Sequence, residues 1–154
     1  MEAVMREAFS MLELVFVLII LGVLAAIAIP RFSVTRIDAQ IVAIENDINN
    51  TISGIQREVF SQSLDPKALD TTQIFTLANL SPARWIIQGD SITLGKNGVI
   101  DSQNACVFVR YDSTQSLLSY EITQKADSTL CTRLFARHPN GGKKIPLNTS
   151  NALF

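Results

Sequence analysis

Two patterns of apolar residues follow one another along the first third of the chain. The first runs from Phe9 to Ile29, where 21 consecutive residues contain one charge, at Glu13. About 20 apolar residues in a helix span the ~30 Å hydrocarbon core of a bilayer. Residues 9–30 are therefore predicted to form a transmembrane helix. A carboxylate in lipid is costly, so Glu13 is expected to have a partner.

The second pattern is a stripe of apolar residues at helical spacing. Its positions fall within an arc of about 80° on a helix, while the rest of the surface is polar. Residues 31–60 are therefore predicted to continue the helix as an amphipathic segment. Pro30 is expected to kink the helix, and Gly22 and Gly54 are weak points within it. The stripe consists of Val34, Ile37, Ile41, Ile44, Ile48, Ile52, Ile55 and Val59.

Residues 61–154 show the shorter alternating patterns of a small β domain. A loop over 61–66 and a short helix over 67–80 come first. Four strands separated by turn residues follow, at 85–87, 91–94, 105–111 and 117–123. An antiparallel sheet of three or four strands needs one face covered, and the stripe can cover it. The predicted fold class is α+β, with a long N-terminal helix packed on a small antiparallel sheet.

Composition and charge argue against several other classes of protein. The net charge of −1 gives no overall attraction to nucleic acid. No nucleophile–base pair, phosphate-binding loop or paired carboxylate is present, so we do not expect an enzyme. His138 is the only histidine and has no cysteine cluster beside it, so no transition-metal site is expected. We expect no cofactor. Calcium stays a weaker alternative, on the turn aspartates Asp90, Asp101, Asp112 and Asp127, which lack recognisable ligand spacing.

The C-terminal region from Ser128 to Phe154 contains basic residues and no acidic ones. A patch of this kind could hold phosphates, which makes nucleic acid a conceivable partner. The favoured interpretation is a solvated, mobile tail rich in Gly, Asn and Pro. The candidate ligand patch consists of Arg133, Arg137, Lys143 and Lys144, with His138 among them.

The residues before the apolar run offer a partner for Glu13. If the chain is cut between Ala8 and Phe9, a new α-amine lies four residues from Glu13. Positions four apart share one face of a helix, and a carboxylate there offsets a positive amine at the helix N-terminus. The amine could belong to the same chain or to a neighbour packed alongside.

The sequence from Ala8 to Pro30, AFSMLELVFVLIILGVLAAIAIP, resembles the N-terminus of type IV pilins and type II secretion pseudopilins. The resemblance covers roughly Arg6 to Arg31 and has the cut-site Phe9, Glu13 four residues later, and the ending from Gly22 to Pro30. Ala8 stands where the family usually has glycine, and because it is also small we expect cleavage there.

The resemblance implies a processing and assembly pathway. A prepilin peptidase would remove the leader, residues 1–8, and methylate the amine of Phe9. The apolar helix would rest in inner-membrane lipid, with the C-terminal domain in the periplasm. An assembly platform would then add the subunit to a filament of identical and related pilins. Phe9, Glu13, Gly22 and Pro30 are the expected assembly residues.

Two simpler interpretations of the apolar run remain. One is a secretory signal peptide cut after Ala28, which the length of the run, Glu13 and Pro30 argue against. The other is a plain single-pass anchor in which Glu13 reaches the lipid headgroups, which leaves the rest of the motif unexplained.

Cys106 and Cys131 are the only cysteines and lie in a domain expected outside the cytoplasm. A disulfide between them would close a loop over residues 106–131 and add about 3.5 kcal/mol on the chain-entropy model. The family resemblance agrees, since many type IV pilins close a C-terminal loop in this way. Two free buried thiols are the alternative.

The sequence as a whole favours a filament subunit, most of all a secretion pseudopilin or related pilin-like protein. A competence (DNA-uptake) or adhesion pilin, whose basic C-terminal region binds a ligand, is the second hypothesis.

Overall fold

The computed structural model describes residues 10–61 and 64–147, without the side chains of residues 27–34. The chain divides into two units, residues 1–38 and 39–154. Its described part is α+β, with helices and one six-stranded antiparallel sheet. The predicted fold class is confirmed at this level.

Helix α1 (Met11–Ser61) contains the predicted amphipathic segment. Five stripe residues lie in the core, Ile37 and Ile52 are half-buried, and the side chain of Val34 is outside the described residues. The side chain of Pro30, where a kink was predicted, is also outside the described residues. The buried stripe residues are Ile41, Ile44, Ile48, Ile55 and Val59.

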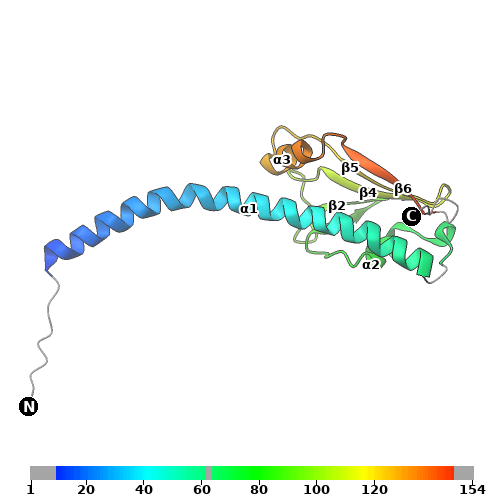
Figure 1. Cartoon of the computed structure of the whole chain (residues 1–154), viewed down its shortest axis with the longest axis horizontal. Coiled ribbons are helices and arrows are strands. Elements are labelled where there is room, and N and C mark those ends of the chain that lie inside the picture. The colour runs from blue at the N-terminus through cyan, green and yellow to red at the C-terminus, as the bar shows by residue number, and fades with distance from the viewer. Residues whose placement is uncertain (1–9, 62–63, 148–154) are drawn as a thin grey trace, which may run out of the picture. The chain divides into compact units, whose positions relative to one another are not determined.

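The sheet has the strand order β1-β2-β4-β5-β6, with β3 paired to β2. Its strands β2, β4 and β5 lie alongside the C-terminal part of α1 (Figure 1). The four predicted strands are present with shifted ends, and two further strands were not predicted. The bounds are β1 (Trp85–Gln88), β2 (Ser91–Lys96), β3 (Val99–Ile100), β4 (Val107–Asp112), β5 (Leu117–Ile122) and β6 (Gly142–Pro146).

Turn residues explain why β2 extends beyond its predicted end at Leu94. Asn97 and Gly98 both have positive φ, at 54° and 80°. Two such residues make the tight turn whose twist suits a two-residue hairpin. The chain therefore reverses at Asn97 and Gly98, and β3 pairs with the end of β2.

The core lies between α1 and the sheet face turned toward it. Asp47 of α1 joins the two layers, because its Oδ2 accepts hydrogen bonds from Arg84 at 2.6 Å and from Trp85 Nε1 at 2.7 Å. The buried side chains alternate along β4, as in a half-buried strand, whereas β2 buries the three successive residues Ile92, Thr93 and Leu94. The largest buried ones are Trp85, Ile92, Val107, Leu118 and Ile122.

The helix predicted over 67–80 is two shorter elements, a 3₁₀ turn η1 (Pro66–Ala68) and helix α2 (Thr71–Leu77). Asp70 separates them. Its carboxylate accepts from the backbone N–H of Gln73, and the Gln73 side chain accepts from the backbone N–H of Asp70. This reciprocal pair starts a new helix rather than continuing the previous turn.

The interpretation of residues 128–154 as a mobile tail is wrong as far as Leu147. Helix α3 (Thr129–Arg137) and strand β6 occupy this region. The helix begins at Ser128, whose side chain caps Cys131 N–H, and it buries Leu130, Cys131 and Leu134. Three apolar residues at helical spacing are enough to anchor this nine-residue helix. The many polar residues around them led to the prediction of a tail.

Candidate functional site

Helix α1 begins at a cap formed by Ser10. The Ser10 hydroxyl accepts from the backbone N–H of Glu13 at 3.3 Å, and the Ser10 carbonyl accepts from the N–H groups of Glu13 and Leu14. A serine followed three residues later by glutamate is a typical start of a helix. Because the cap uses the backbone of Glu13, its carboxylate is not required for it and stands in the first turn.

Every residue from Met11 to Leu24 except Glu13 and Gly22 is a large apolar residue exposed to solvent. Their exposed fractions run from 43% at Ile20 to 84% at Met11. They occupy all sides of the helix, so no core formed by the described residues accounts for them. We call residues 11–24 the apolar helix surface. A helix that is apolar on every side is normally buried in a larger core or in a membrane.

No helix in the part of the chain that the structure describes is both long and apolar enough to cross a membrane.

Gly22 lies within the apolar helix surface and contacts nothing that would exclude a larger residue. A Cβ built on it meets no heavy atom within 4 Å. Its lack of a side chain therefore serves no packing need among the described residues. The predicted processing residues Ala8 and Phe9 lie outside the described residues, and so does the side chain of Pro30.

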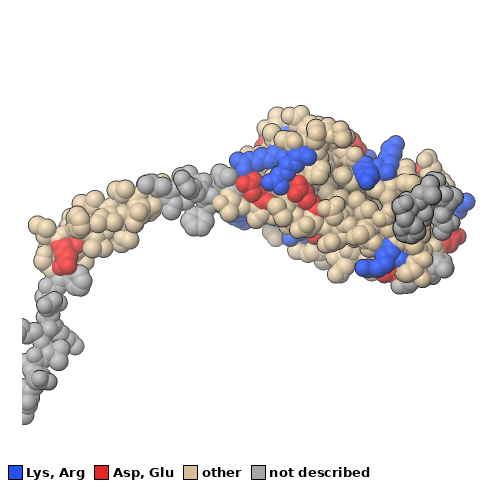
Figure 2. Space-filling view, in the orientation of Figure 1, with Lys and Arg blue, Asp and Glu red and all other residues tan. Residues whose placement is uncertain are grey.

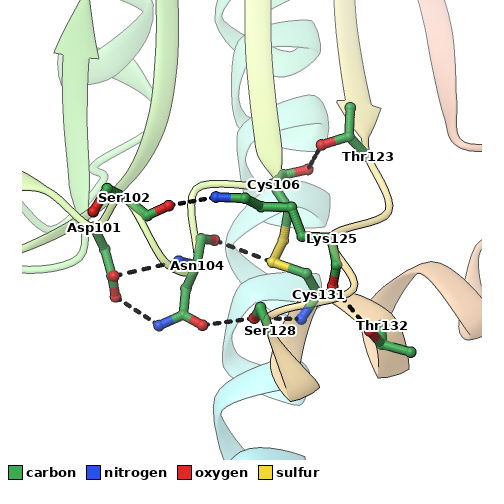
Figure 3. The surroundings of a disulfide bond; sticks show 9 residues. All are labelled: Asp101, Ser102, Asn104, Cys106, Thr123, Lys125, Ser128, Cys131 and Thr132. Carbon is green, nitrogen blue, oxygen red and sulfur yellow. Dashed lines mark hydrogen bonds between the residues drawn. A yellow bond between two sulfur atoms is a disulfide. The ribbon is translucent and has the colours of Figure 1, made fainter.

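The disulfide predicted between Cys106 and Cys131 is present, with the two Cα atoms 5.9 Å apart. Both cysteines are fully buried. It ties the loop before β4 to the first turn of α3, as Figure 3 shows.

A chain of hydrogen bonds runs beside the disulfide (Figure 3). Asn104 donates to Asp101 Oδ2 at 2.8 Å and accepts at its Oδ1 from Ser128 Oγ at 2.7 Å. Ser128 Oγ in turn accepts from the backbone N–H of Cys131 at 3.1 Å. The loop at 101–106 and the start of α3 are thus joined by side-chain hydrogen bonds as well as by sulfur.

The four residues of the candidate ligand patch lie on helix α3 and on the two faces of strand β6. Arg133 and Arg137 belong to α3, and Lys143 and Lys144 are exposed neighbours in β6 that point to opposite faces of the sheet. Arg137 pairs with Glu45 of α1 at 3.3 Å, and His138 Nε2 lies 3.1 Å from the same carboxylate. Basic and acidic side chains accordingly lie together where α3 approaches α1 (Figure 2).

The aspartates considered for calcium have local partners or stand apart. Asp101 binds Asn104, and Asp112 accepts hydrogen bonds from Thr114 and Gln115 in a turn. These hydrogen bonds, first of all that from the Thr114 hydroxyl, lower the pKa of Asp112. Among the described residues no three His, Cys, Asp or Glu side chains are grouped so that they could hold a metal ion.

Two features of the region were not found from the sequence. Ser10 and Glu13 form a cap that the spacing Ser-x-x-Glu could have indicated. The Asp47, Arg84 and Trp85 cluster joins residues 37 and 38 positions apart, and no local pattern indicates such a contact.

Comparison with protein-family models, curated protein sequences and solved structures finds no match for this chain.

Proposed function

We propose that this chain is a structural subunit of a filament of the type IV pilus and type II secretion superfamily, in a secretion pseudopilus or related machine. One observation carries the proposal: the apolar helix surface is exposed on all sides and bears a single charge, at Glu13. The N-terminal motif that resembles prepilins supplies the identity of the assembly.

The energetics of this surface require a cover. Burying one large apolar side chain contributes about 1.5–3 kcal/mol, and twelve such side chains are exposed between Met11 and Leu24. Soluble monomers rarely expose a continuous apolar patch of more than a few hundred Å². Lipid covers this surface before assembly, and the helices of neighbouring subunits cover it afterwards.

Filament growth follows from the asymmetry of the contact. One helix packs on the next in a head-to-tail manner that does not close, so the assembly continues as a helical filament. Prepilin peptidase cuts before Phe9, and the new amine gives the Glu13 carboxylate of a neighbour its counter-charge. Before assembly the subunit stands in the inner membrane with its domain in the periplasm, where the assembly platform and other pseudopilins meet it.

The intact mass of the membrane-extracted protein tests processing. In cells with prepilin peptidase we expect a chain that begins at Phe9 and carries one additional methyl group. Without the peptidase we expect the leader to remain. A chain that begins at Ile29 in both samples would show a secreted soluble domain instead.

A Glu13→Gln variant tests assembly separately from processing. Glutamine keeps the size and the backbone cap, so the domain should unfold as in the parent while filament yield falls by about tenfold or more, equivalent to about 1.4 kcal/mol. Asp127→Asn, an exposed carboxylate of the domain, is the matched control and should leave assembly unchanged. Normal filament yield from the Gln variant would contradict the role of Glu13.

The second candidate is a competence or adhesion pilin whose basic C-terminal region binds a ligand. The exposure of Lys143 and Lys144 favours it. If the ligand is DNA, the slope of log affinity against log salt should become shallower when these lysines are replaced. Binding that does not depend on salt would exclude phosphate contacts.

A further inference from the structure

Strand β6 ends the sheet and leaves one edge without a partner strand among the described residues. Its other edge pairs with β5, and the hydrogen bonds Leu147 N to Ser116 O and Ile122 N to Gly141 O mark the bonded positions. Bonded positions alternate in an antiparallel pair, so the backbone groups of Gly142 and Lys144 point outward. Pro146 ends the row because it has no N–H.

The side chains beside this edge are cationic on both faces of the sheet. Lys143 and Lys144 are exposed, and successive strand residues point to opposite faces. Among the described residues no carboxylate forms a salt bridge with either lysine. The nearby Glu121 and Glu45 are paired with Arg110 and Arg137 instead. A row of free backbone groups is thus flanked by two uncompensated positive charges.

Hollows lie beside the first half of β6. The larger, of about 790 Å³, is lined by residues of the outer sheet face that include Phe108 and Arg110, whose guanidinium lies 5.5 Å from the Phe108 ring centroid. The smaller, of about 380 Å³, is lined by Arg137 and His138 among others. Both also include Gly142 and Lys143, so long side chains of a strand added at this edge could reach across β6 into a hollow.

The same charges disfavour a second copy of β6 as the occupant. Edge-to-edge pairing of two copies would bring lysines together, and like charges opposite each other destabilise a sheet. Lysine at an edge strand is a common protection against such self-pairing. A strand of opposite charge experiences no such repulsion, and backbone pairing at a sheet edge is a known way to bind extended peptides.

We propose that the free edge of β6 binds an extended acidic peptide segment of another protein, which adds to the sheet as a further strand. Gly142 and Lys144 supply the backbone hydrogen bonds. Lys143 and Lys144 select acidic side chains on the two faces. The inference concerns the folded domain and does not depend on filament assembly.

The test uses the full chain in detergent micelles and a fluorescein-labelled ten-residue peptide with four central glutamates between threonines. Consecutive glutamates place carboxylates on both faces of a strand. We expect saturable binding by fluorescence anisotropy that weakens with salt. The same peptide with lysines in place of the glutamates should not bind.

Two variants and one modified peptide separate strand addition from plain charge attraction. Lys144→Glu should weaken binding by at least about tenfold, whereas Lys67→Glu, an equal charge change at an exposed position in η1, should not. A peptide N-methylated at the backbone nitrogens of all four glutamates loses its donors on both edges and should not bind. Unchanged thermal unfolding shows that the variants fold.

Three outcomes would overturn the proposal. An N-methylated peptide that binds as well as the parent peptide would show that charge alone is responsible. A single-stranded oligonucleotide that binds more tightly than the acidic peptide would show a nucleic-acid site. Absence of saturable binding at low salt would show that the edge has no such partner.

Discussion

Asp47 shows how one polar residue can organise the layer contact of the domain. Its Oδ2 accepts from both Arg84 and the indole N–H of Trp85, and Trp85 is 1% exposed. A buried donor that loses its acceptor costs about 1–3 kcal/mol. The ion pair with Arg84 is partly exposed and contributes less.

We therefore predict that Asp47→Ala lowers the free energy of unfolding by about 1–3 kcal/mol, and that Asp47→Asn costs less because it keeps an acceptor for Trp85. Urea unfolding followed by fluorescence of Trp85, the only tryptophan, measures both. Asn46→Ala, at the preceding, exposed position of α1, is the control. Equal losses for the Ala and control variants would show that the indole contact is unimportant.

Tyr111 gives the domain a predictable response to alkaline pH. Burial raises its pKa, the hydrogen bond with Ser116 lowers it, and the charges of Asp65 and Asp112 raise it, with a net upward shift. Its hydroxyl also donates to the Pro66 carbonyl. A folded-state pKa above the unfolded value of 10.0 means that this stabilisation is complete below pH 10 and is lost as pH rises through the folded pKa.

The expected result is a fall in stability above pH 10 that is smaller in Tyr111→Phe, which has no group to ionise there. Absorbance at the tyrosinate band follows the titration directly, and chemical unfolding at several pH values follows stability. Identical pH profiles for the parent and Phe proteins would contradict the assignment of this ionisation to Tyr111.

At the residue scale, the sequence indicated which side of the helix is polar but not which residues its polar side chains bind. Asp47 and Glu45 were both assigned to the polar side of the amphipathic segment, and both prove to bind residues far along the chain, Arg84 and Arg137. Periodicity tells which side of a helix is polar. It carries no information about which distant element approaches that side.

At the scale of elements, the long helix and the four alternating strands β1, β2, β4 and β5 were predictable, whereas α3, β3 and β6 were not. The stripe of α1 repeats over 26 residues, so helical spacing was clear, whereas α3 has three buried residues in a nine-residue helix. Even so, Ser128 as cap and Leu130, Cys131 and Leu134 at helical spacing were a readable signal. At β6 only the alternation of Ile145 with Leu147, one residue past the end of the strand, marked the element.

The disulfide and the hydrogen bond from Ser128 to Asn104 join the same two segments, so we predict that each matters more when the other is lost. Reduction should lower the free energy of unfolding by about 3–4 kcal/mol. In the reduced protein the hydrogen bond from Ser128 to Asn104 is a remaining side-chain link between α3 and the 101–106 loop. Ser128→Ala, which removes both this bond and the helix cap, should therefore cost about 1 kcal/mol when oxidised and more when reduced.

Urea unfolding of parent and variant, each with and without a thiol reductant, gives the four free energies of this comparison. Thr72→Ala, an exposed change in α2, should cost the same in both redox states. An equal cost for Ser128→Ala in both states would show that the disulfide and the hydrogen bonds act independently.

At the scale of the whole molecule, the apolar side chains of the two units differ in exposure. Residues 39–154 contain the buried stripe, the sheet and the disulfide. The apolar helix surface has exposed side chains that contribute nothing to that core. Its presence was predictable because it is a long local pattern. The filament proposed above assigns it a partner in another molecule, which no intramolecular contact can reveal.

Substitutions at Gly22 test the folding of the single chain and the proposed filament assembly separately. Since a Cβ at Gly22 meets nothing within 4 Å, Gly22→Ala should stabilise the isolated helix, by up to about 1 kcal/mol. Neither Gly22→Ala nor Gly22→Leu should change unfolding of the domain, because Gly22 lies outside residues 39–154. In a filament, small residues allow helices to approach closely. The Leu variant should therefore reduce filament yield by about tenfold or more, and the Ala variant by less.

The adjacent exposed Val23 supplies the control, because Val23→Leu enlarges a side chain on the same helix without closing the gap at Gly22. Filament yield after shearing, measured beside domain unfolding, distinguishes assembly from folding. Yield that falls with side-chain size at Gly22 and not at Val23 would place Gly22 at a close contact between subunits. Equal yield from all three variants would mean that the filament, like the single chain, leaves space there, and that Gly22 only lowers the intrinsic stability of the helix.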